Sequence, residues 1–270
     1  MKILIIVTMA GLGNRFREML SFREYALSKK FDKIYFIWHN TKHCSGDVYK
    51  YFIIPDMKIL NYDEKQVDEF DDFIISNVNS YSSSYSHETK KIKYEDNDIL
   101  LEYVGGRGKH RNHWIIDPKI IVFDKEFTRE VDLYINEHLG NDFYAIHLRS
   151  PENTIHIDHE LIKDFIISNK DKNIYIASDY KTYHDMYRKY GNVIIRNNKT
   201  KHHYSRSAVC DALFDILVCS KSIIFIGTPN RVQANSSFSN FIYGVRGVYE
   251  KAVSLEYTNK HYIHSVLNVP

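Results

Sequence analysis

The chain has 270 residues, enough for two modest domains or one large one, which excludes peptide hormones and small disulfide scaffolds. Its 36 Lys and Arg residues nearly balance its 34 Asp and Glu residues, and a net charge of +2 argues against a protein that coats nucleic acids. With 44% hydrophobic and 26% charged residues, the composition is that of a globular protein. Cys44, Cys210 and Cys219 lack metal-ligand spacing, which favours buried reduced thiols in a cytosolic protein.

No segment of the sequence has the pattern of a targeting or membrane-spanning segment. The apolar run at the N-terminus stops at Thr8 and is too short for the core of a signal peptide. No later stretch approaches the roughly 20 apolar residues that cross a bilayer. We therefore expect a soluble cytoplasmic protein without a membrane span, or a soluble catalytic fragment of a longer one.

The first forty residues predict a strand, a glycine turn, a helix and a second strand. Residues 3–8 form an apolar run, ended by Gly11 and Gly13, that is typical of a buried parallel strand. Residues 14–30 carry apolar side chains at helical spacing, and residues 33–39 read as the next strand. This order is the building block of an open parallel sheet covered by helices.

The middle of the chain gives weaker signals. Residues 42–101 include an acidic segment and a serine- and tyrosine-rich run, and we expect loops and short elements there. Residues 105–111 are the stretch richest in glycine and basic residues, which fits either a phosphate-binding loop or a solvated connection. We favour the connection.

The second half alternates regularly between helix and strand. The pattern predicts an α/β fold with two facing Rossmann-like domains, residues 1–123 and residues 124–270, with ligand at the carboxyl ends of parallel strands. The expected helices are residues 124–139, 159–169, 181–190 and 207–219, and the expected strands are residues 143–148, 173–178, 193–196 and 222–226.

The first chemically informative segment is Gly11-Leu12-Gly13-Asn14-Arg15, between the first strand and the first helix. Backbone N–H groups at such a turn can hold an anion or a polar substrate. The segment is not a dinucleotide fingerprint, because Phe16 stands where a third glycine is required and no acidic residue ends the second strand. An NAD enzyme is therefore disfavoured.

Three further strand ends and helix starts carry polar residues. His147 and Arg149 end one strand on the same face, and an arginine there can clamp a pyrophosphate or form a surface ion pair. Asp179 follows another strand, where it can accept from a sugar hydroxyl or cap the next helix. The last candidates lie on and after the helix of residues 207–219, and they are Asp215, Ser236, Ser237 and Phe238.

Taken together and in this order, these segments resemble the fucosyltransferase superfamily with the GT-B fold. That group includes α1,2-, α1,6- and protein O-fucosyltransferases and the nodulation fucosyltransferase. The resemblance rests on Gly11 to Arg17, on the His147 and Arg149 pair, on Ala177-Ser178-Asp179, and on the segments 215–220 and 236–239. It implies a GT-B-like fold in which residues 1–123 form the acceptor-side domain and residues 124–270 the domain that binds the nucleotide sugar. It also implies a GDP-fucose donor, metal-independent inverting transfer, no cofactor, and a glycan or glycoprotein acceptor.

The resemblance also implies roles for single residues. Arg149 corresponds to the pyrophosphate arginine, His147 to its companion near the nucleotide, and Asp215 to the acid that binds guanine. Asn14 and Arg15 correspond to the N-terminal motif near the reacting sugar. The expected donor-binding residues are Gly13, Arg15, His147, Arg149, Asp179, Asp215, Ser236, Ser237 and Phe238, and the expected catalytic residues are Arg149, Glu152 and Asn14.

One position departs from the family pattern. Several relatives have a second arginine after the first, but Ser150 stands there, so Arg15, Arg206 or Arg231 would have to compensate. The departure leaves open a GT-B enzyme with another donor such as UDP-xylose, and a non-catalytic nucleotide-sugar or glycan-binding protein. For the acceptor base, Glu152 is preferred over Glu18, Asp158 and His39.

Overall fold

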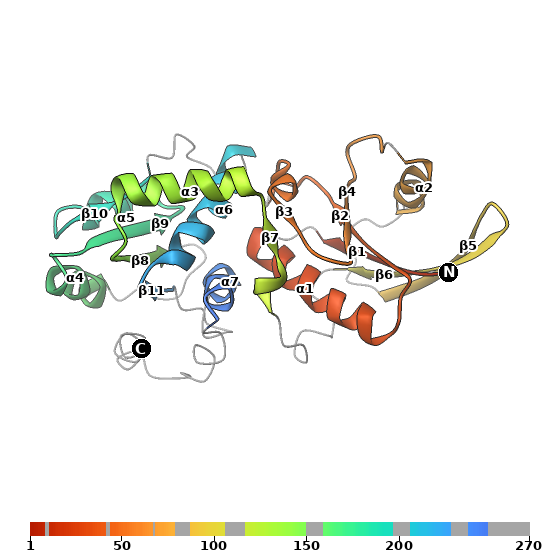
Figure 1. Ribbon diagram of the computed structural model, residues 1–270, viewed down its shortest axis with the longest axis horizontal. Helices are drawn as coiled ribbons and strands as arrows, with labels where there is room; N and C mark the ends of the chain where they lie inside the picture. Colours follow the sequence, from red (N-terminus) through yellow and green to blue (C-terminus); the bar gives the residue numbers. More distant parts are fainter. Residues whose placement is uncertain are drawn as a thin grey trace. The chain divides into compact units, whose positions relative to one another are not determined.

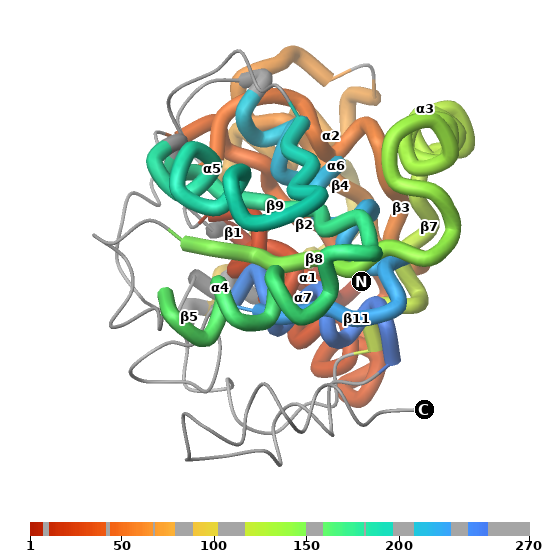
Figure 2. The backbone as a smooth tube through the Cα atoms, turned by 90° about the vertical axis from the view of Figure 1, so that its left-hand side faces the viewer, coloured from red at the N-terminus to blue at the C-terminus, as the bar shows by residue number. Residues whose placement is uncertain are grey.

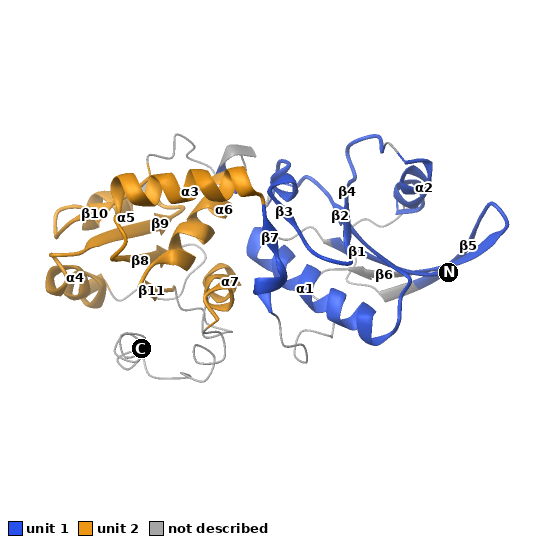
Figure 3. Ribbon diagram, viewed as in Figure 1, with its two compact units in different colours: residues 1–123, 204–209 blue, residues 124–203, 210–270 orange. Residues whose placement is uncertain are grey.

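The computed structural model describes residues 1–8, 11–41, 44–66, 68–78, 87–105, 117–149, 159–196, 206–227 and 237–247. The chain divides into two compact units, one made of residues 1–123 and 204–209 and the other of residues 124–203 and 210–270 (Figure 3). Each unit has its own sheet of mainly parallel strands with helices packed on it (Figure 1). The predicted mixed α/β class with parallel sheets is confirmed.

Unit 1 contains a five-stranded sheet in the order β4-β2-β1-β6-β5. Its four neighbouring strands β4, β2, β1 and β6 are parallel, whereas β5 pairs antiparallel with β6. The apolar residues of β1 alternate between a core under α2 and a face toward α1, as a strand buried on both sides requires. The elements are β1 (Lys2–Thr8), α1 (Leu12–Ser28), β2 (Lys33–Trp38), η1 (Val48–Tyr51), β3 (Phe52–Ile53), β4 (Lys58–Asn61), α2 (Glu69–Val78), β5 (His87–Tyr94), β6 (Asn97–Gly105), η3 (Pro118–Ile120) and β7 (Val122–Phe123).

The expectation of loops and short elements for residues 42–101 is only partly right, because η1, β3 and β4 are short but longer elements follow them. That stretch supplies α2, the edge strand β4, the hairpin β5–β6 and, in β6, the direct neighbour of β1. The hairpin extends beyond the rest of its sheet in Figure 1. Lys90, Lys91 and Lys93 on β5 hid the strand signal, because an edge strand tolerates charges that a central strand does not.

Unit 2 contains a four-stranded parallel sheet in the order β10-β9-β8-β11. Helices α4 and α5 pack on one face, where Ile146, Ile174 and Ile176 meet Phe165 and Tyr187. The chain can be followed from β8 through α4, β9 and α5 in Figure 2. The predicted alternation is confirmed for α3 (Lys125–His138), β8 (Phe143–Leu148), α4 (His159–Ser168), β9 (Asn173–Ser178), α5 (Lys181–Tyr187), β10 (Val193–Ile194), α6 (Arg206–Lys221) and β11 (Ile224–Ile226), and α7 (Ser237–Val245) follows.

The three cysteines agree with a further expectation. Cys44 and Cys219 are buried, Cys210 is half-buried, and none of these three described residues forms a disulfide bond. Among the described residues, no helix is long and apolar enough to cross a membrane.

Candidate functional site

The sheet of unit 2 has a topological switch point between β8 and β11. From β8 the chain continues to β9 on one side of it, while β11 pairs with β8 on the other side. In open parallel sheets, ligands bind outside the carboxyl ends of the strands at such a point. The candidate site is therefore formed by the residues at the ends of β8, β9 and β11 together with the start of α7. We call it the switch-point cluster: His147, Arg149, Asp179, Gly227, Phe238 and Ser239.

His147 and Arg149 lie on the same face of β8, as predicted. Ile146 and Leu148 point into the core under α4 and α5, so the residues between and after them face the opposite side. Arg149 comes directly after the last residue of the strand, where its guanidinium is about one third exposed. A charged fork at the mouth of a strand suits recognition of an anion.

An ion pair joins the ends of β8 and β9. Nη1 of Arg149 lies 2.8 Å from Oδ2 of Asp179, whose side chain is mostly buried. The Ser178 hydroxyl donates to the Leu148 carbonyl at 2.6 Å and accepts from the backbone N–H of Tyr180 at 3.1 Å. The structure thus brings together two predicted donor-site residues, and the same strand ends hold the arginine in one orientation.

His147 connects β8 to α7. Its Nδ1 lies 2.8 Å from the hydroxyl of Ser239, and its ring lies 4.6 Å, between centroids, from the ring of Phe238. Burial, with a smaller effect of the Arg149 charge, lowers the pKa of His147 from 6.5 to about 3. The ring is therefore neutral at pH 7, so it can act as a hydrogen-bond partner but does not add a positive charge.

The C-terminal end of helix α7 is fixed by two further residues. The Tyr243 hydroxyl accepts from the backbone N–H of Gly227 at 2.9 Å. Directly after the helix, the Arg246 guanidinium donates to the Ser222 hydroxyl at 3.0 Å and to the Ile223 carbonyl at 2.9 Å, just after α6 ends. Ser237 begins α7 beside the cluster, and the N-terminal end of a helix favours negative charge.

Asp215 lies apart from this cluster. Its carboxylate accepts from the Tyr175 hydroxyl, and Tyr175 precedes Asp179 by four residues on β9, about 13 Å along an extended strand. Burial raises the pKa of Asp215 from 3.8 to about 7, while the Tyr175 hydrogen bond and the Arg196 charge act in the opposite direction. The structure therefore places the Asp215 carboxylate further back along the sheet than Arg149. The guanine-binding role of Asp215 stays a prediction.

In unit 1, the predicted turn residues lie at the start of α1. Gly11 is the N-cap, and its carbonyl accepts from the backbone N–H groups of Asn14 and Arg15. Gly13 is buried in the first turn, and Oδ1 of Asn14 accepts from Arg17 at 2.7 Å. These residues share one helix start, and the catalytic role of Asn14 stays a prediction.

Arg15 is fully buried and holds a loop of its own unit. Its Nη2 donates to the His39 carbonyl at 2.7 Å and also contacts the Cys44 carbonyl at 3.4 Å. The guanidinium carbon lies 4.4 Å from the centroid of the Trp38 ring, and burial lowers the pKa of Arg15. These contacts anchor the segment after β2. For Arg15 to contact the donor as predicted, its guanidinium would have to leave the carbonyl groups that it binds here.

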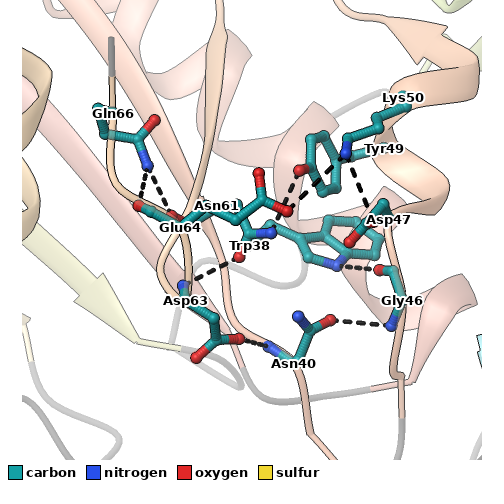
Figure 4. A network of polar contacts seen from close by, with 10 residues as sticks. All are labelled: Trp38, Asn40, Gly46, Asp47, Tyr49, Lys50, Asn61, Asp63, Glu64 and Gln66. Atoms are coloured by element: carbon teal, nitrogen blue, oxygen red, sulfur yellow. Dashed lines mark hydrogen bonds and ion pairs between the residues drawn. The ribbon is translucent and has the colours of Figure 1, made fainter. Parts of the chain in front are cut away.

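A polar network continues from this loop across the ends of β2 and β4 (Figure 4). Trp38 Nε1 donates to the Gly46 carbonyl at 2.9 Å, and Oδ1 of Asn40 accepts from the Gly46 N–H at 2.8 Å. Asp63 accepts from the Asn40 N–H at 3.2 Å, and its own N–H donates to Asn61 Oδ1 at 3.0 Å. The polar groups at this edge largely bind one another and shape the loop.

The remaining candidate residues from the sequence lie in different surroundings or outside the described residues. Glu18 is buried on α1 near Arg15, and the His39 ring packs on Tyr62 at 4.7 Å between centroids. Four candidates lie outside the described residues, and they are Glu152, Asp158, Arg231 and Ser236; the side chain of Arg206 is likewise not described. The loop favoured as a connection is also outside from residue 106 onward.

Among the residues that the structure describes, no group of three or more His, Cys, Asp or Glu side chains is arranged to hold a metal ion. The charged side chains of the switch-point cluster are those of Arg149 and Asp179.

Comparison with known proteins then places the architecture. No protein-family model matches the sequence, and no curated protein matches it either. Solved structures do match: the fucosyltransferase NodZ from Bradyrhizobium aligns with a TM-score of 0.56 at 11% identity, covering 90% of this chain and 92% of NodZ. POFUT1 in complex with GDP aligns with a TM-score of 0.57 at 12% identity, covering 93% and 96%.

The chain has a fucosyltransferase-like fold. Crystal structures of NodZ α-1,6-fucosyltransferase soaked with GDP-fucose and of POFUT1 in complex with GDP-fucose align at TM-scores of 0.54 and 0.57, with 12% and 10% identity. They cover 90% and 92% of this chain, and 92% and 94% of their own chains. The alignment thus spans nearly the whole of both partners, and the predicted GT-B class is confirmed.

Within this fucosyltransferase-like fold, the sequence analysis gave no role to two residues of the cluster, Gly227 and Ser239, or to Tyr243 beside them. Ser239 binds His147, Gly227 packs against Ser239, and Tyr243 binds the Gly227 backbone. The available signal was the glycine that ends β11, since a glycine at a strand end often marks a close backbone approach. The contact between positions 147 and 239 spans 92 residues, and no local pattern encodes it.

Proposed function

We propose that this protein is a glycosyltransferase that transfers L-fucose from GDP-fucose to a hydroxyl group of a glycan or glycoprotein, without a metal ion and with inversion at the anomeric carbon. The observation that carries the proposal is the partly exposed Arg149 at the switch point of the unit 2 sheet, beside α7. The fold supports it, because NodZ soaked with GDP-fucose and POFUT1 in complex with GDP-fucose share it.

Arg149 would bind the diphosphate of the donor. Its guanidinium presents donors in a fixed fork that matches phosphate oxygens, and it keeps its charge at any working pH. The ion pair with Asp179 holds the fork at the carboxyl end of β8 before the donor arrives. Positioned donors of this kind stabilise charge that develops during the reaction, at a site that does not need to reorganise.

The chemical step breaks one bond and forms one. The bond between the anomeric carbon and the β-phosphate oxygen breaks, and its electron pair leaves with the nucleoside diphosphate. An acceptor hydroxyl oxygen attacks the anomeric carbon from the opposite face and loses its proton to a base. Arg149 and the N–H groups at the start of α7 would stabilise the departing negative charge.

Two groups of residues would complete the reaction. His147, Phe238 and Ser237 would contact the nucleotide from β8 and α7, with His147 acting as a neutral hydrogen-bond partner. Glu152 remains our candidate for the acceptor base. Asn14 remains our candidate for a contact with the reacting sugar.

The first experiment is a binding and turnover panel on the purified protein. We expect GDP and GDP-fucose to raise its melting temperature, because a ligand at 100 times its Kd stabilises the folded state by about 2.7 kcal/mol. GDP should then be released over time only when GDP-fucose and a glycan acceptor are both present. UDP sugars serve as the matched controls.

Each other outcome would indicate a different function for this protein. Stabilisation by UDP and UDP-xylose instead would retain a glycosyltransferase but overturn the fucose donor. Stabilisation by GDP-fucose without GDP release on any acceptor of a broad glycan array would favour the nucleotide-sugar-binding alternative. No stabilisation by any nucleotide would contradict the whole proposal.

A further inference from the structure

The contact between β11 and α7 is unusually close. A Cβ atom added to Gly227 would lie 2.7 Å from Cβ of Ser239, 2.9 Å from its Oγ and 3.0 Å from a ring carbon of Tyr243. Real Cβ atoms essentially never approach a neighbour within 3.0 Å, so only glycine fits at this position without a shift of α7. We call Gly227, Ser239 and Tyr243, together with His147, the α7 seat.

The close approach brings one hydroxyl to one histidine. Ser239 is completely buried, and its Oγ reaches Nδ1 of His147 at 2.8 Å across two distant parts of the chain. The Tyr243 hydroxyl accepts from the Gly227 N–H one turn further along α7 and fixes the same face of the helix. The seat therefore sets the rotation of α7 and the position of the His147 ring at the same time.

A neutral histidine presents one donor and one acceptor, and the partner of one nitrogen decides which is which. Burial and the nearby Arg149 charge lower the pKa of His147, which keeps the ring in its neutral form. A hydroxyl that donates to Nδ1 leaves the proton on Nε2. An N–H donor, rather than a lone pair, is what a negatively charged diphosphate requires.

We propose that Ser239 is a positioning residue, whose hydroxyl donates to Nδ1 of His147, fixes the Nε2–H form of that ring, and so preorganises a donor for a nucleoside diphosphate. The role rests on the proposed function for its ligand, but its effect on the His147 ring does not. Gly227 supports it, because its missing side chain is what lets Ser239 reach the histidine.

Three variants test the seat. Ser239→Ala removes the hydroxyl, Ser239→Cys keeps a weak donor of similar size, and Gly227→Ala displaces Ser239 without altering it. Ser220→Ala is the matched control, because the Ser220 hydroxyl donates only locally to the Leu217 carbonyl on α6. Urea unfolding of each variant identifies any that fail to fold.

Two readouts are measured on the whole chain: the ¹⁵N shifts of the His147 ring, which report the tautomer, and the Kd for GDP by calorimetry. We expect the Nε2–H form in the wild type and in Ser220→Ala, and a mixture of tautomers in Ser239→Ala and Gly227→Ala. The Kd for GDP should rise about 5- to 30-fold in those two variants and less in Ser239→Cys, as expected for the loss of one positioned hydrogen bond.

The outcomes separate the seat from the proposed function. A wild-type protein that binds GDP, with unchanged Kd and tautomer in Ser239→Ala, overturns the seat and leaves the function intact. A wild-type protein that binds no nucleotide overturns the function, and the tautomer then decides alone whether Ser239 positions His147. An Nδ1–H form in the wild type overturns the seat in either case.

Discussion

Each compact unit places an arginine near the carboxyl ends of its parallel strands, Arg15 on α1 of unit 1 and Arg149 after β8 of unit 2. Arg15 is fully buried, donates to backbone carbonyls of its own unit and lies over the Trp38 ring. Arg149 is about one third exposed and forms an ion pair with the Asp179 carboxylate. The same kind of side chain at the same edge of a sheet therefore stabilises a loop in one unit, whereas in the other it is the residue that we propose to bind the diphosphate.

The largest expected effect is on the stability of unit 1. We expect Arg15→Ala to lower the free energy of unfolding by about 3–5 kcal/mol, because it removes a buried charged donor from its carbonyl acceptors and leaves a cavity. Urea unfolding measures the change, and Arg17→Ala is the control from the same helix. If Arg15→Ala instead folded with normal stability but no longer bound the donor, Arg15 would be a donor-binding residue and not a structural one.

Arg149→Ala should show the opposite behaviour. We expect stability to change little, because the guanidinium is partly exposed, while turnover falls by about 10²–10³-fold with the loss of a diphosphate donor. Steady-state kinetics with GDP-fucose measure the fall. Arg129→Ala, which removes an exposed arginine of α3 from a surface ion pair, is the control and should leave kcat and KM unchanged. Near-normal kcat and KM in Arg149→Ala would remove Arg149 from the site.

Two buried groups of unit 2 give pH effects of opposite sign. Burial raises the pKa of Asp215 to about 7, so its contribution to stability is complete below its ordinary value of 3.8 and is lost as the pH rises through about 7. Burial and the Arg149 charge lower the pKa of His147 to about 3, so its contribution is present above 6.5 and is lost as the pH falls. Between these ordinary values the two slopes oppose each other.

Asp215→Asn should separate them. With the Asp215 slope removed, the free energy of unfolding should rise with pH by up to about 1.4 kcal/mol per unit between about pH 4.5 and 6, which is the slope of one titrating group. Urea unfolding at several pH values measures it, and the wild type should be nearly flat over the same range. Equal slopes in the two proteins would mean that Asp215 is ionised in the folded state.

The regular elements of unit 2 could be predicted because local patterns encode them. The strands that begin at Phe143 and Asn173 are apolar runs next to helical periodicity, and both were predicted with their observed ends. The hairpin β5–β6 could not be predicted in the same way, since β5 carries charges that suit an edge strand and its partner is apolar. A strand buried on both faces is recognisable in the sequence as a continuous apolar run, whereas an edge strand with charged residues lacks such a run.

The site divides along the same line. The pairing of Arg149 with Asp179 could be anticipated, because both end neighbouring parallel strands. The burial of Arg15 could not, because it depends on carbonyls of a loop about 25 residues away. The position of Asp215 beside Tyr175 likewise depends on how α6 packs on β9, which a motif does not specify.

The smallest expected effect concerns the partner of Arg149. Asp179→Asn should lower the free energy of unfolding by less than about 1 kcal/mol, because the ion pair is partly exposed. It should still raise the Kd for GDP a few-fold, since the fork would no longer be held at the end of β8. Urea unfolding and calorimetry on the same preparation measure both quantities. Tighter binding of GDP in Asp179→Asn would show instead that the carboxylate competes with the diphosphate for Arg149, and the ion pair would then oppose donor binding.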